Sequence, residues 1–142
     1  MHFTRGRREE VLEKHLLAEN SHDIDAIMST FAEDAVVLWG GKPYRGRDAI
    51  RRLHEGMGFG DDGAFSDLTI VEIRRHTTEQ AIIIEQELRG RHTGTWEGKG
   101  ATERSVTVPV CTVYEFDDNG LIVSERPHLD RWVIWKQIGG TR

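Results

Sequence analysis

Residues 104–116 read RSVTVPVCTVYEF, a run in which apolar and polar positions alternate. Alternation with a period of two is typical of a strand that buries one face and exposes the other. The segments 67–76, 80–96 and 121–130 have the same character and are rich in β-branched residues. The motif DDNG at 117–120 is typical of a hairpin turn. These segments predict four long, largely antiparallel strands.

The first part of the chain has the apolar spacing of helices instead. Apolar residues recur at helical intervals in 7–20 and again in 24–33, where Asp23 is suited to cap the second helix. A short strand at 35–39 and a third helix at 47–57 follow. Helices followed by long strands predict an α+β domain with the helices on one face of the sheet. Long strands must curl, and a curled sheet closed by helices encloses a pocket.

Composition and charge narrow the function classes. A chain of 142 residues, 37% hydrophobic and 30% charged, is expected to form one soluble domain over 1–142, with 1–6 flexible. The net charge of −5 argues against nucleic acid as a partner. The single Cys111 excludes an internal disulfide and a multi-cysteine zinc site. No apolar stretch is long enough for a membrane helix and the first residues are not a signal peptide, so a cytoplasmic location is expected.

The inward faces of the predicted strands carry a few polar and aromatic side chains. On 104–116, Thr112 and Tyr114 share the face of the valines, and on 80–96, His92 and Trp96 share the face of the isoleucines. Apolar walls with few polar groups are typical of small-molecule sites. These residues are therefore candidates for lining a pocket.

The last strand ends in ERPHLD, residues 125–130, which places His128 and Asp130 two positions apart. Residues at that spacing on a strand face the same way, so they could form an acid–base pair. Pro127 cannot donate to a ladder, so we expect an edge position or a bulge there, and whether His128 or Leu129 faces inward stays open. The alternative is a solvated pair at a strand end.

Several motifs resemble those of the SnoaL-like polyketide cyclases of the nuclear-transport-factor-2-like superfamily. The stretch RGRHTGTWEGKGATERSV (89–106) carries the family's Gly-Arg-His-x-Gly pattern, and DDNGLIV and the D…QIG segment (130–139) follow it. The stretches 20–37 and 44–54 are also typical of the superfamily. The resemblance implies a cone, in which a strongly curved mixed or antiparallel sheet wraps around the N-terminal helices, with a deep apolar cavity and frequent homodimers.

The catalytic residues of that superfamily do not carry over. The aspartate that such cyclases use on the last strand falls at Pro127, as does the carboxylate of limonene-epoxide-hydrolase relatives, and the cyclase histidine falls near Thr112. In an alignment with ketosteroid isomerases, His15 takes the place of their oxyanion-hole tyrosine and Trp39 that of their basic aspartate. Thr112 takes the place of their protonated aspartate. The resemblance thus implies the fold and leaves the chemistry open.

Other residues could still handle protons in the pocket. The alignment places His15 on the pocket side of the first helix, where the alternative is a buried histidine bonded to a carbonyl. His128 with Asp130 is the second candidate, although Asp130 is also suited to tie the strand to the final helix. His54 is expected on the surface. The candidate catalytic residues are His15, His128 and Asp130, and the candidate substrate-binding residues are Trp39, Tyr44, His92, Trp96, Thr112 and Tyr114.

Two hypotheses from different classes follow. The first is an enzyme without a cofactor or metal that performs cyclase, isomerase or dehydratase chemistry on an apolar cyclic or polyketide-like molecule. The second is a non-catalytic module of the same fold that binds a ligand in the cavity or a partner on the sheet face. The apolar segment 132–135 would be explained by burial in the core or in a dimer. A metal triad of His92, His128 and Asp130 has no supporting spacing motif.

Overall fold

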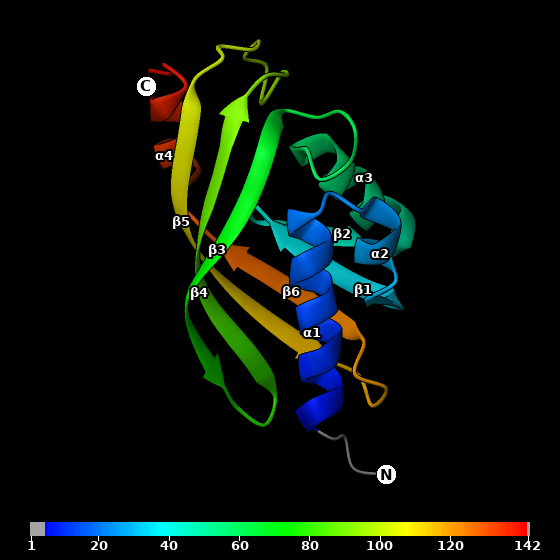
Figure 1. Ribbon diagram of the computed structural model, residues 1–142. Helices are drawn as coiled ribbons and strands as arrows, with labels where there is room; N and C mark the ends of the chain where they lie inside the picture. Colours follow the sequence, from blue (N-terminus) through cyan, green and yellow to red (C-terminus); the bar gives the residue numbers. More distant parts are fainter. Residues whose placement is uncertain (1–4, 142) are drawn as a thin grey trace.

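The computed structural model describes residues 5–141 and contains a six-stranded sheet and four helices in that range (Figure 1). The helices are α1 (Arg5–Asn20), α2 (Ile24–Met28), α3 (Arg47–Met57) and α4 (Arg131–Gln137). The strands are β1 (Phe31–Trp39), β2 (Lys42–Arg45), β3 (Phe65–Thr77), β4 (Ala81–His92), β5 (Ser105–Phe116) and β6 (Ile122–His128). No helix among the described residues has the length and apolar character needed to cross a membrane.

The sheet has the strand order β2-β1-β6-β5-β4-β3. Adjacent strands are antiparallel, except for β1 and β6, which are parallel. Figure 1 shows α1, α2 and α3 on one side of this curved sheet, with α1 crossing in front of β6, while α4 packs near β5 at the other end. The expected α+β architecture with a mixed, curved sheet around the N-terminal helices is therefore confirmed.

The strand faces expected to point inward are the buried ones. On β4 the buried side chains include Ile82, Ile84 and Gln86, and on β5 they include Thr112 and Tyr114. The helices contribute a second apolar layer, whose fully buried members are Leu12, Ile27 and Ile50. The core thus lies between the sheet and the helices, and Thr112 and Gln86 are polar residues within it.

Strand β6 differs from the expectation in a way that matters for the site. It lies in the middle of the sheet, between β1 and β5, and not at an edge. Its pairing with β5 shifts register between Phe116↔Ile122 and Glu115↔Ser124. This bulge changes the phase of the strand, so that Ile122 and Glu125 are both buried although an odd number of positions separates them.

Pro127 is accommodated without an edge position. The last pair between β6 and β1 is Glu125↔Val37, so Pro127 lies beyond the part of β6 that pairs with β1. Its partner on the other side is Thr112 of β5. A missing N–H is therefore tolerated in a central strand at this point.

Some element boundaries also differ. The second helix ends at Met28 and β1 already begins at Phe31, so the helical pattern predicted for 24–33 is cut short. Helix α1 begins at Arg5, so residues 5 and 6 are helical; residues 1–4 of the segment expected to be flexible lie outside the described range. Asp23 caps α2 as predicted, accepting a hydrogen bond from the backbone N–H of Ala26.

The apolar C-terminal segment forms α4, which places Ile134 in the core and leaves Trp132 and Trp135 half-buried. The ring of Trp135 lies 6.4 Å from that of Trp96. Packing within the chain thus covers part of this surface, and the expected homodimer stays a prediction.

Candidate functional site

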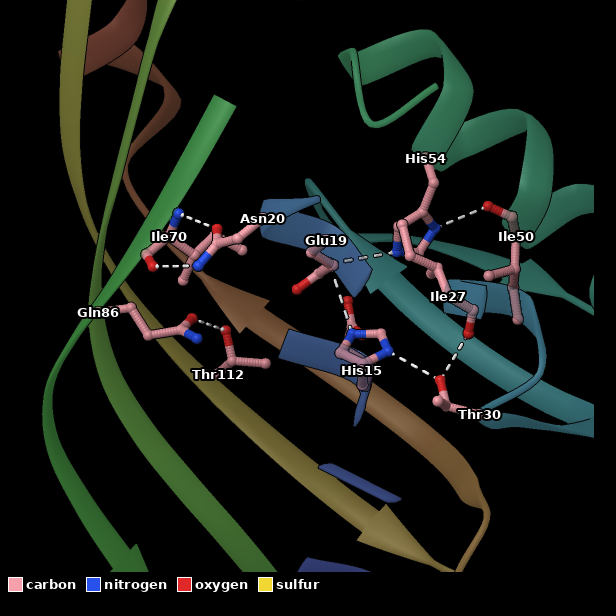
Figure 2. Close-up of polar contacts among 11 residues, drawn as sticks. His15, Glu19, Asn20, Ile27, Thr30, Ile50, His54, Ile70, Gln86 and Thr112 are labelled. Carbon is pink, nitrogen blue, oxygen red and sulfur yellow. Dashed lines mark hydrogen bonds and ion pairs between the residues drawn. The ribbon is translucent and has the colours of Figure 1, made fainter. Parts of the chain in front are cut away.

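Four ionisable side chains meet in the interior: His15 and Glu19 of α1, His54 of α3 and Glu125 of β6, here called the tetrad. All four are buried, with His15 fully inaccessible. His15 Nε2 lies 3.4 Å from Glu19 Oε2 and 3.2 Å from Glu125 Oε1, and His54 Nε2 lies 3.5 Å from the same Glu19 oxygen. Figure 2 shows Glu19 between the two imidazole rings.

Local structure explains why these residues meet. His15 and Glu19 are four positions apart and therefore share one face of α1. His54 lies on the buried face of α3 with Ile50 and Met57. Glu125 points inward because of the bulge in β6.

The end of α1 is fastened to β3, which fixes the position of Glu19. The Asn20 side chain donates to the Ile70 carbonyl at 3.0 Å and accepts from the Ile70 N–H at 2.7 Å (Figure 2). His22 Nε2 lies 2.7 Å from the Leu68 carbonyl and adds a second contact to the same strand. The carboxylate next to Asn20 is thus held at a defined depth between helix and sheet.

Neighbouring groups set the orientation of both imidazoles. The Thr30 hydroxyl donates to the Ile27 carbonyl at 2.6 Å, so its oxygen accepts the Nδ1–H of His15 at 2.9 Å. His54 Nδ1 lies 2.9 Å from the Ile50 carbonyl, which can only accept, so this nitrogen carries a proton as well. In both rings Nε2 is therefore the atom that faces the carboxylates (Figure 2).

The tetrad perturbs the ionisation of its members. Burial alone would lower the pKa of His15, but Glu19 and Glu125 outweigh it and raise the pKa to about 10. Burial likewise opposes the charge of His54, whose pKa is nevertheless raised, chiefly by Glu19 and Glu125. Burial would raise the pKa of Glu19, but the two histidines lower it well below its usual range. Without a bound ion, His15 and Glu19 are thus charged near neutral pH, and the shift in the pKa of His54 favours its protonated form.

A cavity opens beside the tetrad. It has a volume of about 60 Å³, and Glu19, His54 and Glu125 line one part of it together, whereas His15 contacts two of them without lining the cavity itself. The pKa of Tyr114 is raised by burial and by the charges of Glu125 and Glu19, so its phenol stays neutral. The other lining residues are Val37, Trp39, Leu53, Met57, Phe59, Ile70, Gln86, Leu88, Val110, Thr112 and Pro127.

A wider hollow of about 730 Å³ adjoins this cavity, and Trp39, Leu53 and Met57 line both. We call it the outer basin. Tyr44 and Trp96 line it as well. Trp39, Leu53 and Met57 therefore lie where the cavity and the outer basin meet.

The structure distributes the sequence-predicted pocket residues over different places. Trp39, Thr112 and Tyr114 line the cavity, and Tyr44 and Trp96 line the outer basin. His92 is fully buried but lines neither. Its Nδ1 lies 2.9 Å from the Thr102 hydroxyl oxygen, and its ring packs on Phe65.

Of the three candidate catalytic residues, the structure places only His15 next to the cavity, where it contacts the lining residues Glu19 and Glu125. His128 is exposed at the end of β6 and lines a separate surface hollow with Asp130. The Asp130 carboxylate accepts from the Trp132 N–H at 2.9 Å and caps α4, which is the structural role named as the alternative.

Three of the tetrad residues, Glu19, His54 and Glu125, were not identified as candidates from the sequence. His54 was expected on the surface, and this is wrong: only 4% of it is exposed, because it shares the buried face of α3 with Ile50. Glu19 was detectable in principle, since it follows His15 by one helical turn. Glu125 had no local signal, because the bulge that turns it inward depends on pairing with β5.

Comparison with known proteins agrees with this architecture. TsrD from Streptomyces laurentii superposes with a TM-score of 0.82 at 17% identity, over 99% of this chain and 100% of that chain. A protein described as a SnoaL-like polyketide cyclase, from Jannaschia sp. CCS1, gives a TM-score of 0.84 at 14% identity, over 100% and 99% of the two chains. An epoxide hydrolase of M. tuberculosis that resembles limonene epoxide hydrolase gives a TM-score of 0.71 at 21% identity, over 94% of this chain and 90% of that chain.

At these identities the structural likeness establishes the fold alone, and no curated protein matches the chain in sequence. The sequence model of the SnoaL-like domain matches residues 12–125, which include all four members of the tetrad. The protein therefore belongs to the SnoaL-like family, as its motifs indicated.

Proposed function

We propose that this protein is an enzyme that moves protons on a cyclic or polyketide-like molecule, in a reaction of cyclase, isomerase or dehydratase type. The observation that carries the proposal is the end of the cavity, where three buried ionisable side chains, Glu19, His54 and Glu125, meet apolar walls. Buried titratable groups with perturbed pKa values in a pocket are typical of acid–base sites. The known relatives of this fold include cyclases and hydrolases, which is consistent with small-molecule chemistry.

The cavity provides both parts that such a reaction needs. A carboxylate oxygen of Glu125 can take a proton from a carbon next to a carbonyl, and the positive charge within the tetrad stabilises the negative charge that develops on the carbonyl oxygen. Gln86 Nε2 is buried and makes no hydrogen bond with any described residue, so it can donate to a substrate oxygen. Glu125 and Pro127 both line the cavity, so the last strand still provides a carboxylate close to the position where the family's aspartate is replaced.

The dimensions of the cavity restrict how a substrate binds. Small-molecule pockets usually measure about 300–1,000 Å³, whereas the cavity measures about 60 Å³. We infer that only the reacting end of the molecule enters it and that the remainder lies in the outer basin between Trp39, Tyr44 and Trp96.

The proposal is tested by proton exchange in D₂O, followed by NMR, with a panel of cyclic ketones and lactones. The protein should accelerate exchange at carbons next to the carbonyl for at least one compound. Glu125→Gln should lose most of this activity, and Glu85→Gln, which changes an exposed carboxylate on β4, should keep it.

A second variant is needed because Glu125→Gln could lose activity simply by failing to fold. Leu53→Trp leaves the tetrad intact but narrows the passage between the cavity and the outer basin, and it should also reduce exchange. Binding of panel compounds without any exchange would overturn the proposal in favour of a ligand-binding module. Equal exchange by Glu125→Gln and the unchanged protein would remove Glu125 from the mechanism.

A further inference from the structure

We propose that the tetrad of His15, Glu19, His54 and Glu125 is a binding site for one divalent transition-metal ion. The site itself follows from geometry, and what the ion does there rests on the function proposed above. The ligand atoms of these four side chains all lie within 4.8 Å of one another, in a buried position. Two imidazole nitrogens and two carboxylate oxygens form a ligand set common for zinc, iron and manganese.

The first argument is that the tetrad leaves polar atoms without hydrogen bonds. His15 Nε2, Glu19 Oε1 and Glu125 Oε1 are all buried and make no hydrogen bond with any described residue. Unpartnered buried polar atoms are rare because each costs about 1–3 kcal/mol. Two of them, His15 Nε2 and Glu125 Oε1, lie 3.2 Å apart inside the tetrad, so an ion bound between them would satisfy both.

The second argument is the spacing of the ligand atoms. A charge-assisted hydrogen bond between an imidazolium and a carboxylate measures about 2.7–2.9 Å, but the three contacts measure 3.2, 3.4 and 3.5 Å. Ligands bound tetrahedrally at about 2.0–2.2 Å from an ion lie about 3.3–3.6 Å from each other. These three separations thus fit ligands of one ion better than hydrogen bonds, and the other pairs, which lie within 4.8 Å of one another, would draw closer when the ion binds.

The third argument is the orientation of the histidines. Ligating histidines usually donate their second N–H to an oxygen, which fixes the ring and directs the other nitrogen at the ion. Both rings here have this arrangement: His15 donates from Nδ1 to Thr30, and His54 donates from Nδ1 to Ile50. His15 Nε2 contacts both carboxylates, and His54 Nε2 contacts that of Glu19.

Charge balance agrees with this assignment. A divalent cation compensates the two carboxylates and leaves both imidazoles neutral, which is the form that burial favours. Glu19, His54 and Glu125 line the cavity, so the ion would have an open side toward a bound molecule. There it would polarise a substrate carbonyl as a Lewis acid and stabilise the developing oxyanion.

The tetrad is a different site from the metal triad of His92, His128 and Asp130 that was considered from the sequence. His128 is paired with Cys111 in the middle of β5, whereas His92 lies at the far end of β4, opposite residues near the start of β5. Those two histidines and Asp130 are therefore not brought together, and the metal ligands come from α1, α3 and β6 instead.

The experiment begins with protein stripped by EDTA and measures binding of Zn²⁺ by calorimetry and the bound metal after dialysis by elemental analysis. One ion per chain is expected. Co²⁺ should give visible absorption bands of a low-coordinate site. His54→Gln should abolish stoichiometric binding, whereas His76→Gln, which changes an exposed histidine on β3, should bind as the unchanged protein does.

Thr30→Val provides a milder variant that keeps all four ligands. It removes the acceptor of the His15 Nδ1–H and should weaken binding by about 10–100-fold. Absence of one-to-one binding, or equal binding by His54→Gln and the unchanged protein, would overturn the metal site. Proton exchange that persists in EDTA, with no ion bound, would support the proposed function and overturn the role of the metal in it. Binding of one ion without proton exchange in any compound would support the metal site and overturn the proposed function.

Discussion

The chain contains two places where a histidine and an acid lie close together on or beside β6, and they differ in almost every physical respect. His15 and Glu125 meet in the interior, among four buried ionisable groups at the end of an apolar cavity. His128 and Asp130 lie near the surface at the end of the strand, where Asp130 caps a helix. The same residue types thus form a buried ionisable cluster in one place and a helix cap in the other.

The difference lies in what surrounds the charges. In the interior each charge needs a partner, because water cannot compensate it, and the tetrad supplies partners from three separate elements. At the strand end water screens both groups, and the carboxylate is occupied by the backbone N–H of Trp132. Proximity in sequence, as in ERPHLD, is therefore a weaker guide to chemistry than convergence in space.

The largest effect is expected from removing the central histidine of the tetrad. In metal-free protein, His15→Gln leaves the buried Glu125 without its charged partner and Glu19 with His54 alone, and it should reduce the free energy of unfolding by about 3–5 kcal/mol. His128→Gln, at an exposed position, should change it by less than about 0.5 kcal/mol. Urea unfolding in the presence of EDTA measures both. Similar losses in the two variants would contradict the contrast drawn between the two places.

The contrast also shows how far the sequence alone could lead. Period-two alternation predicted the buried faces of β4 and β5, because these two strands pair with each other without a register shift. Thr112 and Tyr114 were correctly placed among the buried residues. The family motifs predicted the cone. His15 was found only through the superfamily alignment, because a lone histidine on a helix has no chemical signature of its own.

The remainder of the site depends on contacts that no local pattern records. Glu125 follows the bulge in β6, which arises where β5 and β6 change register. His54 reaches the tetrad only because α3 packs on β1. A bulge or an edge position was expected at Pro127 from the sequence, but the side-chain phase of β6 changes before Glu125 rather than at the proline.

A smaller effect should follow from releasing α1 from the sheet. Asn20→Ala removes both hydrogen bonds to the backbone of Ile70 and should lower the free energy of unfolding by about 1–3 kcal/mol. Because Glu19 precedes Asn20, the variant should also loosen the tetrad, which hydrogen exchange of the α1 amides would detect. Asn20→Asp keeps the acceptor for the Ile70 N–H and should lose less. An unchanged exchange pattern would show that the core packing of α1 is sufficient to position Glu19.

The smallest effect concerns the surface pair and isolates its structural role. Asp130→Ala removes the cap of α4 and should cost about 1 kcal/mol, whereas Asp130→Asn should be nearly neutral, because asparagine caps a helix as well as aspartate does. Thermal unfolding compares the two variants. Equal destabilisation by both would mean that the charge of Asp130, and not its hydrogen bond to Trp132, is what stabilises this end of the molecule. Since α4 packs Ile134 into the core beside β5, a lost cap should loosen that contact and leave the tetrad intact.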